Sequence, residues 1–360
     1  MGSASPTAVK PSWGPLVGLV LGAAMAVAVA EVALRIVTPL RPPIREVSEG
    51  VADLEVSNPD VLVLGSSHAR SFEAVATLLA SRSGGNRRMV IVPEEGGTFY
   101  AFNWVLQHRL RPLIEERDGS GRLVRDRISQ LLLVTTYWDT CPVPQTLAAN
   151  LPSRAWVLGD YLADVAAHGM TDTNRNYAQS RWKALWPFSY LVRDRGAEHL
   201  KHGLLQWAHL ERRETPDERR RERLLTRRGE FESDYSTCDD ESQKAELRQI
   251  LDYLKERRIA VTIVLFPLVQ EALTDAAKET TLRRYAASLE EIERERPFRM
   301  IDMTLNAPLT VEDFEPDLDH VTRAGNRKFA EWALDHDLAF LLSPTSAAAD
   351  GATKTSGEGS

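Results

Sequence analysis

The 360-residue sequence lacks several signatures that would identify a binding site, and each absence excludes a class of protein. It has no His-Glu-x-x-His, and its eight histidines are scattered without ligand spacing, which argues against a metallo-hydrolase. It has no Rossmann or P-loop glycine motif, so no nucleotide cofactor is implied. Its net charge of −7 argues against nucleic-acid binding. The sequence therefore predicts no metal, no cofactor and no nucleic-acid partner.

Cysteine is also scarce. Cys141 and Cys238 are the only two, and their separation does not match a zinc site. Two such thiols could form one disulfide outside the cytoplasm, or they could be two small buried hydrophobes. The sequence alone leaves both alternatives open.

Charge is absent from one long segment near the N-terminus. Residues 11–30, between Lys10 and Glu31, are uncharged and rich in valine, leucine, alanine and glycine. Twenty residues at 1.5 Å each just span a bilayer core. We therefore predict an N-terminal tail and transmembrane anchor over residues 1–40, followed by a polar, proline-bearing spacer over residues 41–56.

Two points complicate this N-terminal prediction. Ala28-Val29-Ala30 resembles a signal-peptidase site, so a cleaved signal peptide is the alternative to an anchor. Arg35, Arg41 and Arg45 follow the segment, and the positive-inside rule would keep the body in the cytoplasm. The family resemblance described below favours a single-pass membrane protein with an extracytoplasmic catalytic domain instead.

Strand and helix patterns alternate through the rest of the chain. Helices are predicted over 71–81, 103–111, Glu241–Glu256, 274–294 and, with Thr322 as N-cap, 323–341. Short apolar runs predict five strands, at Val61–Gly65, Met89–Pro93, 130–136, 259–266 and 300–303. This alternation is typical of a doubly wound, mostly parallel five-stranded α/β sheet over residues 57–342.

Two segments depart from the alternation. Residues 143–240 predict a helical insertion that contains Trp156, Trp182, Trp186 and Trp207, and residues 343–360 predict a disordered tail. The arginine-rich run 211–228 within the insertion is typical of a solvated helix face, with an anion-binding patch as the alternative.

Two distant motifs carry chemistry. Ser67 follows the first strand in Gly65-Ser66-Ser67-His68, at the carboxyl end of a parallel sheet, where ligands bind. Asp317-x-x-His320 precedes the last helix, and its three-residue spacing lets the acid orient the ring. A serine, a histidine base and an orienting aspartate are the groups that nucleophilic acyl transfer needs.

These motifs resemble those of the SGNH (GDSL-like) hydrolase superfamily. Gly65-Ser66-Ser67-His68 stands where that family has Gly-Asp-Ser, and Asp317-Leu-Asp-His320-Val-Thr-Arg-Ala-Gly325 stands where it has Asp-x-x-His-(apolar)-(Ser/Thr)-x-x-Gly. The resemblance covers residues 57–142 and 241–342 and implies a flavodoxin-like sheet. It also implies Ser67 as nucleophile, His320 as general base and Asp317 as orienting acid. Asp319 is the competing acid, but it adjoins His320 and should point elsewhere.

The chain departs from the family pattern in two places. Ser66 replaces an aspartate, and Val134-Thr-Thr-Tyr137-Trp138-Asp139 replaces the third block, Gly-x-Asn-Asp. The family's oxyanion donors are the nucleophile's N–H, a glycine after the second strand and an asparagine after the third. By resemblance the donors here would be Ser67, Gly97 (or Gly96) and, at the third position, Thr136, Tyr137 or a backbone N–H.

We therefore expect a serine-dependent acyl esterase or O-acyltransferase. By analogy with membrane-linked relatives, its substrate would be an acylated, for example O-acetylated, cell-envelope glycan or a small ester. The membrane and envelope proteins would be its partners. The alternative is a catalytically weak or inactive SGNH-shaped scaffold that binds glycan or a partner protein through the tryptophan-rich insertion; the altered third block favours this alternative.

Overall fold

In the computed structural model the chain divides into two units. One comprises Met1–Ile44 and Met170–Arg213, and the other comprises Arg45–Gly169 and Glu214–Ser360. The structure describes Met25 and residues 47–94, 96–141, 156, 158–171, 174, 175, 177, 178, 215–233, 240–275, 278–315 and 317–343. Among these, no helix has the length and apolar character to cross a membrane. The predicted anchor apart from Met25, the tail 343–360 apart from Ser343, and Cys238 lie outside the described residues.

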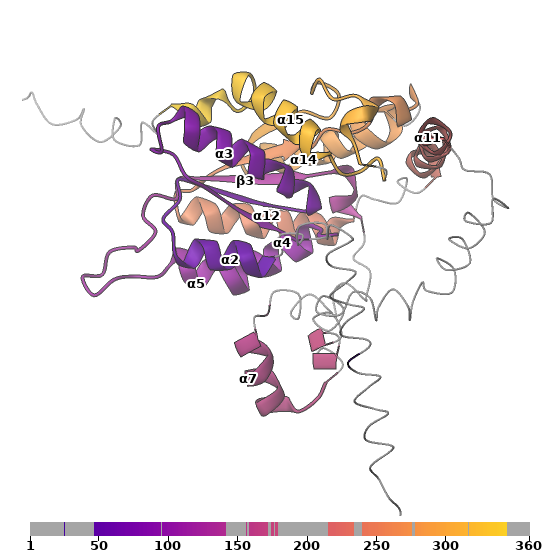
Figure 1. Ribbon diagram of the computed structural model, residues 1–360. Helices are drawn as coiled ribbons and strands as arrows, with labels where there is room; N and C mark the ends of the chain where they lie inside the picture. Colours follow the sequence, from indigo (N-terminus) through magenta and orange to yellow (C-terminus); the bar gives the residue numbers. More distant parts are fainter. Residues whose placement is uncertain are drawn as a thin grey trace, which may run out of the picture. The chain divides into compact units, whose positions relative to one another are not determined.

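The second unit contains a five-stranded sheet whose spatial order is β2-β1-β3-β4-β5. All four strand pairs are parallel, so the predicted sheet is confirmed (Figure 1). In this order the chain reverses its direction of sheet growth between β1 and β3, and ligands bind at such a switch point. The strands are β1 (Val61–Gly65), β2 (Met89–Pro93), β3 (Gln130–Thr135), β4 (Ala260–Leu265) and β5 (Arg299–Asp302).

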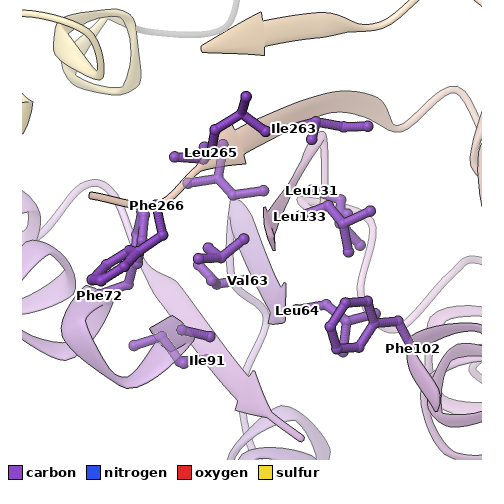
Figure 2. Packing of buried hydrophobic residues seen from close by; sticks show 14 of the residues in the cluster. Val63, Leu64, Phe72, Ile91, Phe102, Leu131, Leu133, Ile263, Leu265 and Phe266 are labelled. Atoms are coloured by element: carbon purple, nitrogen blue, oxygen red, sulfur yellow. The ribbon is translucent and has the colours of Figure 1, made fainter. Parts of the chain in front are cut away.

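Helices cover both faces of the sheet, which explains why β1 is buried along its whole length. One face carries α3 (Phe72–Arg82), α14 (Arg283–Glu295) and α15 (Arg323–Asp335). The other carries α2 (Val47–Glu55), α4 (Phe99–Val105), α5 (Arg111–Ile114) and α12 (Glu241–Glu256) (Figure 1). Figure 2 shows buried side chains of this core, such as Val63, Leu64 and Phe102. The rings of Phe72 and Phe266 each contact that of Phe329, with centroids 5.6 Å apart.

Helix boundaries follow the sequence signals closely in some places and poorly in others. Glu241–Glu256 is a helix as predicted, and Thr322 caps α15 by accepting a hydrogen bond from the Gly325 N–H at 3.1 Å. The predicted helix 323–341 ends early at Asp335, before η9 (Ala339–Leu342). The predicted helices 103–111 and 274–294 contain π-helical turns, η2 (Leu106–Leu110) and η7 (Lys278–Leu282), that hydrophobic spacing does not reveal.

The predicted spacer 41–56 is wrong for Val47–Glu55, which is helix α2. Val47, Val51 and Leu54 are buried in the core. Gly50 lies so close to β2 that a Cβ there would come within 2.4 Å of the Ile91 carbonyl oxygen. The apolar positions 47, 51 and 54 have helical spacing, but the polar residues between them and the preceding prolines obscured that signal.

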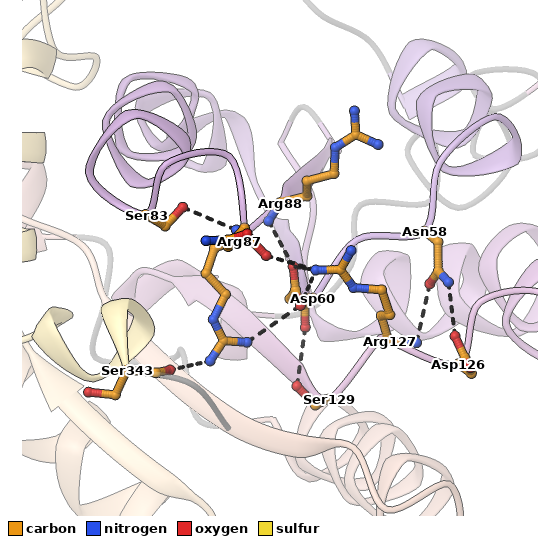
Figure 3. A network of polar contacts seen from close by, with 10 residues as sticks. Asn58, Asp60, Ser83, Arg87, Arg88, Asp126, Arg127, Ser129 and Ser343 are labelled. Atoms are coloured by element: carbon orange, nitrogen blue, oxygen red, sulfur yellow. Dashed lines mark hydrogen bonds and ion pairs between the residues drawn. The ribbon is translucent and has the colours of Figure 1, made fainter. Parts of the chain in front are cut away.

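A polar network joins the strands at the amino edge of the sheet (Figure 3). Asp60, immediately before β1, is buried and accepts hydrogen bonds from the Arg88 N–H at 2.8 Å and from Arg127 Nη2 at 2.9 Å. Arg87 completes an ion pair at 3.5 Å. The Ser129 N–H donates to the Asp60 carbonyl oxygen, so one residue joins the starts of β1, β2 and β3.

The insertion leaves and re-enters the α/β body at neighbouring points. The Asp240 N–H, just before α12, donates at 3.0 Å to the carbonyl oxygen of Thr140, the last residue of η3 (Tyr137–Thr140). Cys141 is disulfide-bonded, so of the two alternatives the bridge is the one observed for this residue. Between these points the described residues include α7 (Leu158–His168) and α11 (Pro216–Ser233).

Candidate active site

Ser67 lies where β1 ends against its neighbours. Gly65, the last residue of β1, approaches β3 so closely that a Cβ would come within 2.4 Å of the Val134 carbonyl oxygen. The chain then turns into a short helix, η1 (Ser67–Ser71), with extended backbone at Ser66. This turn places the Ser67 hydroxyl at the carboxyl edge, beside the switch point between β1 and β3.

The Asp317–His320 segment belongs to a tight loop between η8 (Val311–Asp313) and α15. Phe314 and Val321 form an antiparallel bridge at its base, and the Glu315 N–H donates to the His320 carbonyl oxygen at 2.6 Å. Leu318 adopts φ 55°, a left-handed conformation that costs a non-glycine residue about 1 kcal/mol. Its buried side chain holds the turn in place. The loop is therefore fixed at both ends and at its apex.

The structure brings the three predicted catalytic side chains into one chain of hydrogen bonds. His320 Nε2 lies 2.8 Å from Ser67 Oγ, and His320 Nδ1 lies 2.9 Å from Asp317 Oδ2. Asp317 Oδ1 accepts the N–H groups of Asp319 and His320, each at 3.0 Å. With the ring proton on Nδ1 facing the carboxylate, Nε2 is an acceptor for the serine O–H. This is the arrangement a base needs to take that proton.

The charges in this hydrogen-bonded chain favour the protonated form of the His320 imidazole. Burial alone would raise the pKa of Asp317, but hydrogen bonds from the His320 side chain and from backbone N–H groups outweigh it, and the pKa is strongly lowered. The hydrogen bond to Asp317 raises the pKa of His320, against an opposing effect of burial. Asp317 therefore stays ionised and stabilises the imidazolium that would form during acyl transfer.

A second imidazole lies beside the first, and the sequence did not identify it as a site residue. The His68 ring is stacked on that of His320, with centroids 5.6 Å apart and planes 10° apart. His68 Nδ1 lies 2.9 Å from Ser66 Oγ, and His68 Nε2 lies 3.1 Å from the Asp319 carbonyl oxygen. His68 thus links the nucleophile turn to the loop that carries the base. Its position directly after Ser67 was the only available signal.

Asp319 has a separate role from Asp317. The contact with His320 Nδ1 comes from Asp317, while the Asp319 carboxylate forms an ion pair with Arg227 of α11. Asp319 also lies 3.5 Å from His68 Nε2. Burial would raise the pKa of Asp319, but His68 and Arg227 outweigh that effect and lower it. The carboxylate therefore stays charged beside the His320 ring without touching its Nδ1.

The backbone N–H groups of two of the predicted oxyanion-donor residues already have acceptors. The Gly97 N–H donates to the Glu94 carbonyl oxygen at 2.9 Å, and the Thr136 N–H donates to Asp139 Oδ2 at 2.8 Å. Both groups are thus engaged within their own turns. The N–H of Gly96, the alternative glycine, has no acceptor among the residues that the structure describes. Turn-internal hydrogen bonds of this kind could not be predicted from residue type.

Comparisons with known proteins add little to this geometry. No protein-family model matches the chain, and no curated protein matches it. Among solved structures, a mutant of an acetyl-xylooligosaccharide esterase from Geobacillus stearothermophilus is similar, with a TM-score of 0.36 and 11% identity over 76% of this chain and 92% of that chain. A protein described as an acylhydrolase from Bacteroides fragilis has a TM-score of 0.35 and 10% identity, over 82% and 95%. TM-scores this low carry no argument about the site or its reaction.

Proposed function

We propose that this protein is a serine-dependent acyl ester hydrolase of the SGNH type, with Ser67 as nucleophile, His320 as general base and Asp317 as orienting acid. One observation carries the proposal: the continuous hydrogen-bonded chain from Ser67 Oγ through the His320 ring to Asp317. Its members come from opposite ends of the sequence. A serine hydroxyl is a poor nucleophile at neutral pH until a neighbouring base takes its proton.

The reaction begins with attack of Ser67 Oγ on the ester carbonyl carbon while His320 Nε2 takes the hydroxyl proton. The tetrahedral intermediate collapses when the imidazolium returns that proton to the leaving alkoxide, which forms the acyl-serine. Water then attacks the acyl-serine with His320 again as base and releases the acid. In a transferase, a sugar hydroxyl would replace water in the second step, and the same three residues would serve.

The developing oxyanion needs donors at the same edge of the sheet. The Ser67 N–H, at the start of η1, is one candidate. The Gly96 N–H, with no acceptor among the described residues, is the candidate after β2. The Ser67 N–H belongs to the same residue as the reacting oxygen. The Gly96 N–H belongs to the turn that follows the neighbouring strand.

The finer part of the proposal concerns substrate and location. We infer an acylated, for example O-acetylated, cell-envelope glycan or a small ester as substrate. The protein would be anchored by residues 11–30, or exported with a cleaved signal peptide, and its site would lie outside the cytoplasm. The disulfide at Cys141 supports an oxidising compartment. Envelope proteins would be its partners.

Hydrolysis of an activated short-chain aryl ester tests the reaction. We expect the wild type to release product steadily and Ser67→Ala to lose at least about 10³-fold in kcat. Diisopropyl fluorophosphate should add one phosphoryl group to Ser67, located by mass spectrometry of the digested protein. Equal traces of product from both proteins would overturn the proposal.

The second candidate is a non-catalytic SGNH-shaped scaffold that binds glycan. The engaged N–H groups of Gly97 and Thr136 favour it, because they leave fewer donors for an oxyanion. Glycan binding that is unchanged in Ser67→Ala, together with no turnover by the wild type, would support this candidate.

A further inference from the structure

Helix α11, in the insertion, contacts the loops at the carboxyl edge of the sheet. Arg220 pairs with Glu312 in η8, and Arg228 donates to the Glu271 carbonyl oxygen in η6 (Gln270–Ala272). Leu224 packs against the hydrophobic core. The helix therefore lies along the loops that follow β4 and β5. The sequence analysis favoured a solvated face for this arginine run, and these contacts show that part of the run is docked instead.

Arg227, unlike Arg220 and Arg228 of the same helix, contacts the candidate site. Its guanidinium forms an ion pair with the Asp319 carboxylate and lies over the Trp138 ring, 4.7 Å from the centroid. Its side chain is only 13% exposed, whereas that of Arg220 is 37% exposed. A guanidinium held between a carboxylate and an indole is fixed in orientation as well as position.

Asp319 connects Arg227 to the residues that surround Ser67. It immediately precedes His320, and its N–H donates to Asp317 Oδ1. Its carbonyl oxygen contacts His68 Nε2, and its carboxylate lies between Arg227 and His68. Moving the Asp319 carboxylate would therefore disturb the orienting acid, the general base and the second imidazole together.

We propose that Arg227 is a positioning residue for acyl transfer, which holds Asp319 and thereby fixes the Asp317–His320 loop and His68 against Ser67. The inference rests on the proposed function for its kinetic consequences. It assigns part of the insertion to the catalytic machinery although Arg227 belongs to neither motif. Without Arg227, the Asp319 carboxylate would lose its guanidinium partner.

The charges around His320 give the proposal an electrostatic signature. Asp317 and Asp319 stabilise the imidazolium, and Arg70, from η1, opposes it. His68 stacks on the ring, and Ser67 faces its Nε2. Arg227 neutralises Asp319, so its loss exposes His320 to an unpaired carboxylate. A side chain with a purely structural role would leave this balance of charge unchanged.

The test measures aryl-ester turnover from pH 5 to 9 for Arg227→Gln, with Arg228→Gln as a matched control on the same helix. We expect kcat to fall about tenfold in Arg227→Gln through misplacement of the base. The acid limb of kcat/KM should move up by roughly half a pH unit, because an unpaired carboxylate favours the imidazolium. Arg227→Lys, which keeps the charge, should restore the limb. Arg228→Gln should behave as wild type.

Asp319→Asn keeps the proposal falsifiable if Arg227→Gln unfolds. This substitution removes the negative charge that stabilises the His320 imidazolium, so the acid limb of kcat/KM should move to lower pH. Wild-type limbs in both Arg227→Gln and Asp319→Asn would overturn the proposal. If Ser67→Ala showed that the protein is not an esterase, NMR titration of the His320 ring would still decide. An upward shift in Arg227→Gln supports the coupling, and no shift refutes it.

Discussion

The two edges of the same sheet each hold an aspartate that accepts several hydrogen bonds, and they differ in what donates them. At the amino edge Asp60 accepts a backbone N–H and arginine guanidinium groups. At the carboxyl edge Asp317 accepts two backbone N–H groups and an imidazole. Both aspartates accept backbone N–H groups, but their side-chain partners differ.

That partner decides whether the cluster can do chemistry. A guanidinium stays protonated at every physiological pH, so the network around Asp60 can only hold strands together. An imidazole exchanges its proton near neutrality, and the second nitrogen of His320 faces a hydroxyl. The cluster at the carboxyl edge can therefore transfer a proton, while the network at the amino edge only holds the strands together.

Replacing each aspartate by asparagine should separate the two roles, and the largest effect is expected at Asp317. Asp317→Asn keeps the shape but removes the charge that orients and stabilises the imidazolium. We expect a loss of about 10³-fold in kcat for an aryl ester. The melting temperature should change little, because Asp317 lies on an exposed turn. A variant with wild-type kcat would contradict the role given to Asp317.

The opposite result is expected at Asp60. Asp60→Asn leaves Arg87 and Arg127 without their buried carboxylate, which should lower the free energy of unfolding by about 3 kcal/mol. Urea denaturation would measure this loss. The kcat of the remaining folded protein should equal that of the wild type. A large fall in kcat at unchanged stability would mean that the two edges are coupled, against the comparison drawn above.

The smallest expected effect is on the pH dependence of kcat/KM, which should depend on the carboxyl edge and not on the amino edge. His320 must be neutral to act as base, and its pKa is raised above 6.5 by Asp317. The kcat/KM should therefore fall on acidification, with a midpoint above that of an ordinary histidine. Asp60→Asn should show the same midpoint, since arginine partners do not titrate in this range. A midpoint below that of an ordinary histidine in the wild type would contradict the raised pKa of His320.

The features that could be predicted from the sequence are those with local signals. Apolar runs located the five strands, and Ser67, Asp317 and His320 were found because nucleophile, acid and base have distinctive residue types in recognisable contexts. Arg227 was missed because its role depends on how α11 docks, which no local pattern encodes. Gly97 and Thr136 were predicted as oxyanion donors by resemblance, which does not reveal that their N–H groups have acceptors within their own turns.

The hydrogen bond between Asp240 and Thr140, which joins the two ends of the insertion, has an evolutionary consequence. An insertion whose two ends already touch can change length at little cost in free energy, about 0.6 kcal/mol for each doubling of a flexible loop. Exchange of part of the segment between Thr140 and Asp240 for one of another length should therefore leave the register of the strands unchanged. Because Arg227 belongs to that insertion, such an exchange would alter how the reaction is tuned while the scaffold stayed the same.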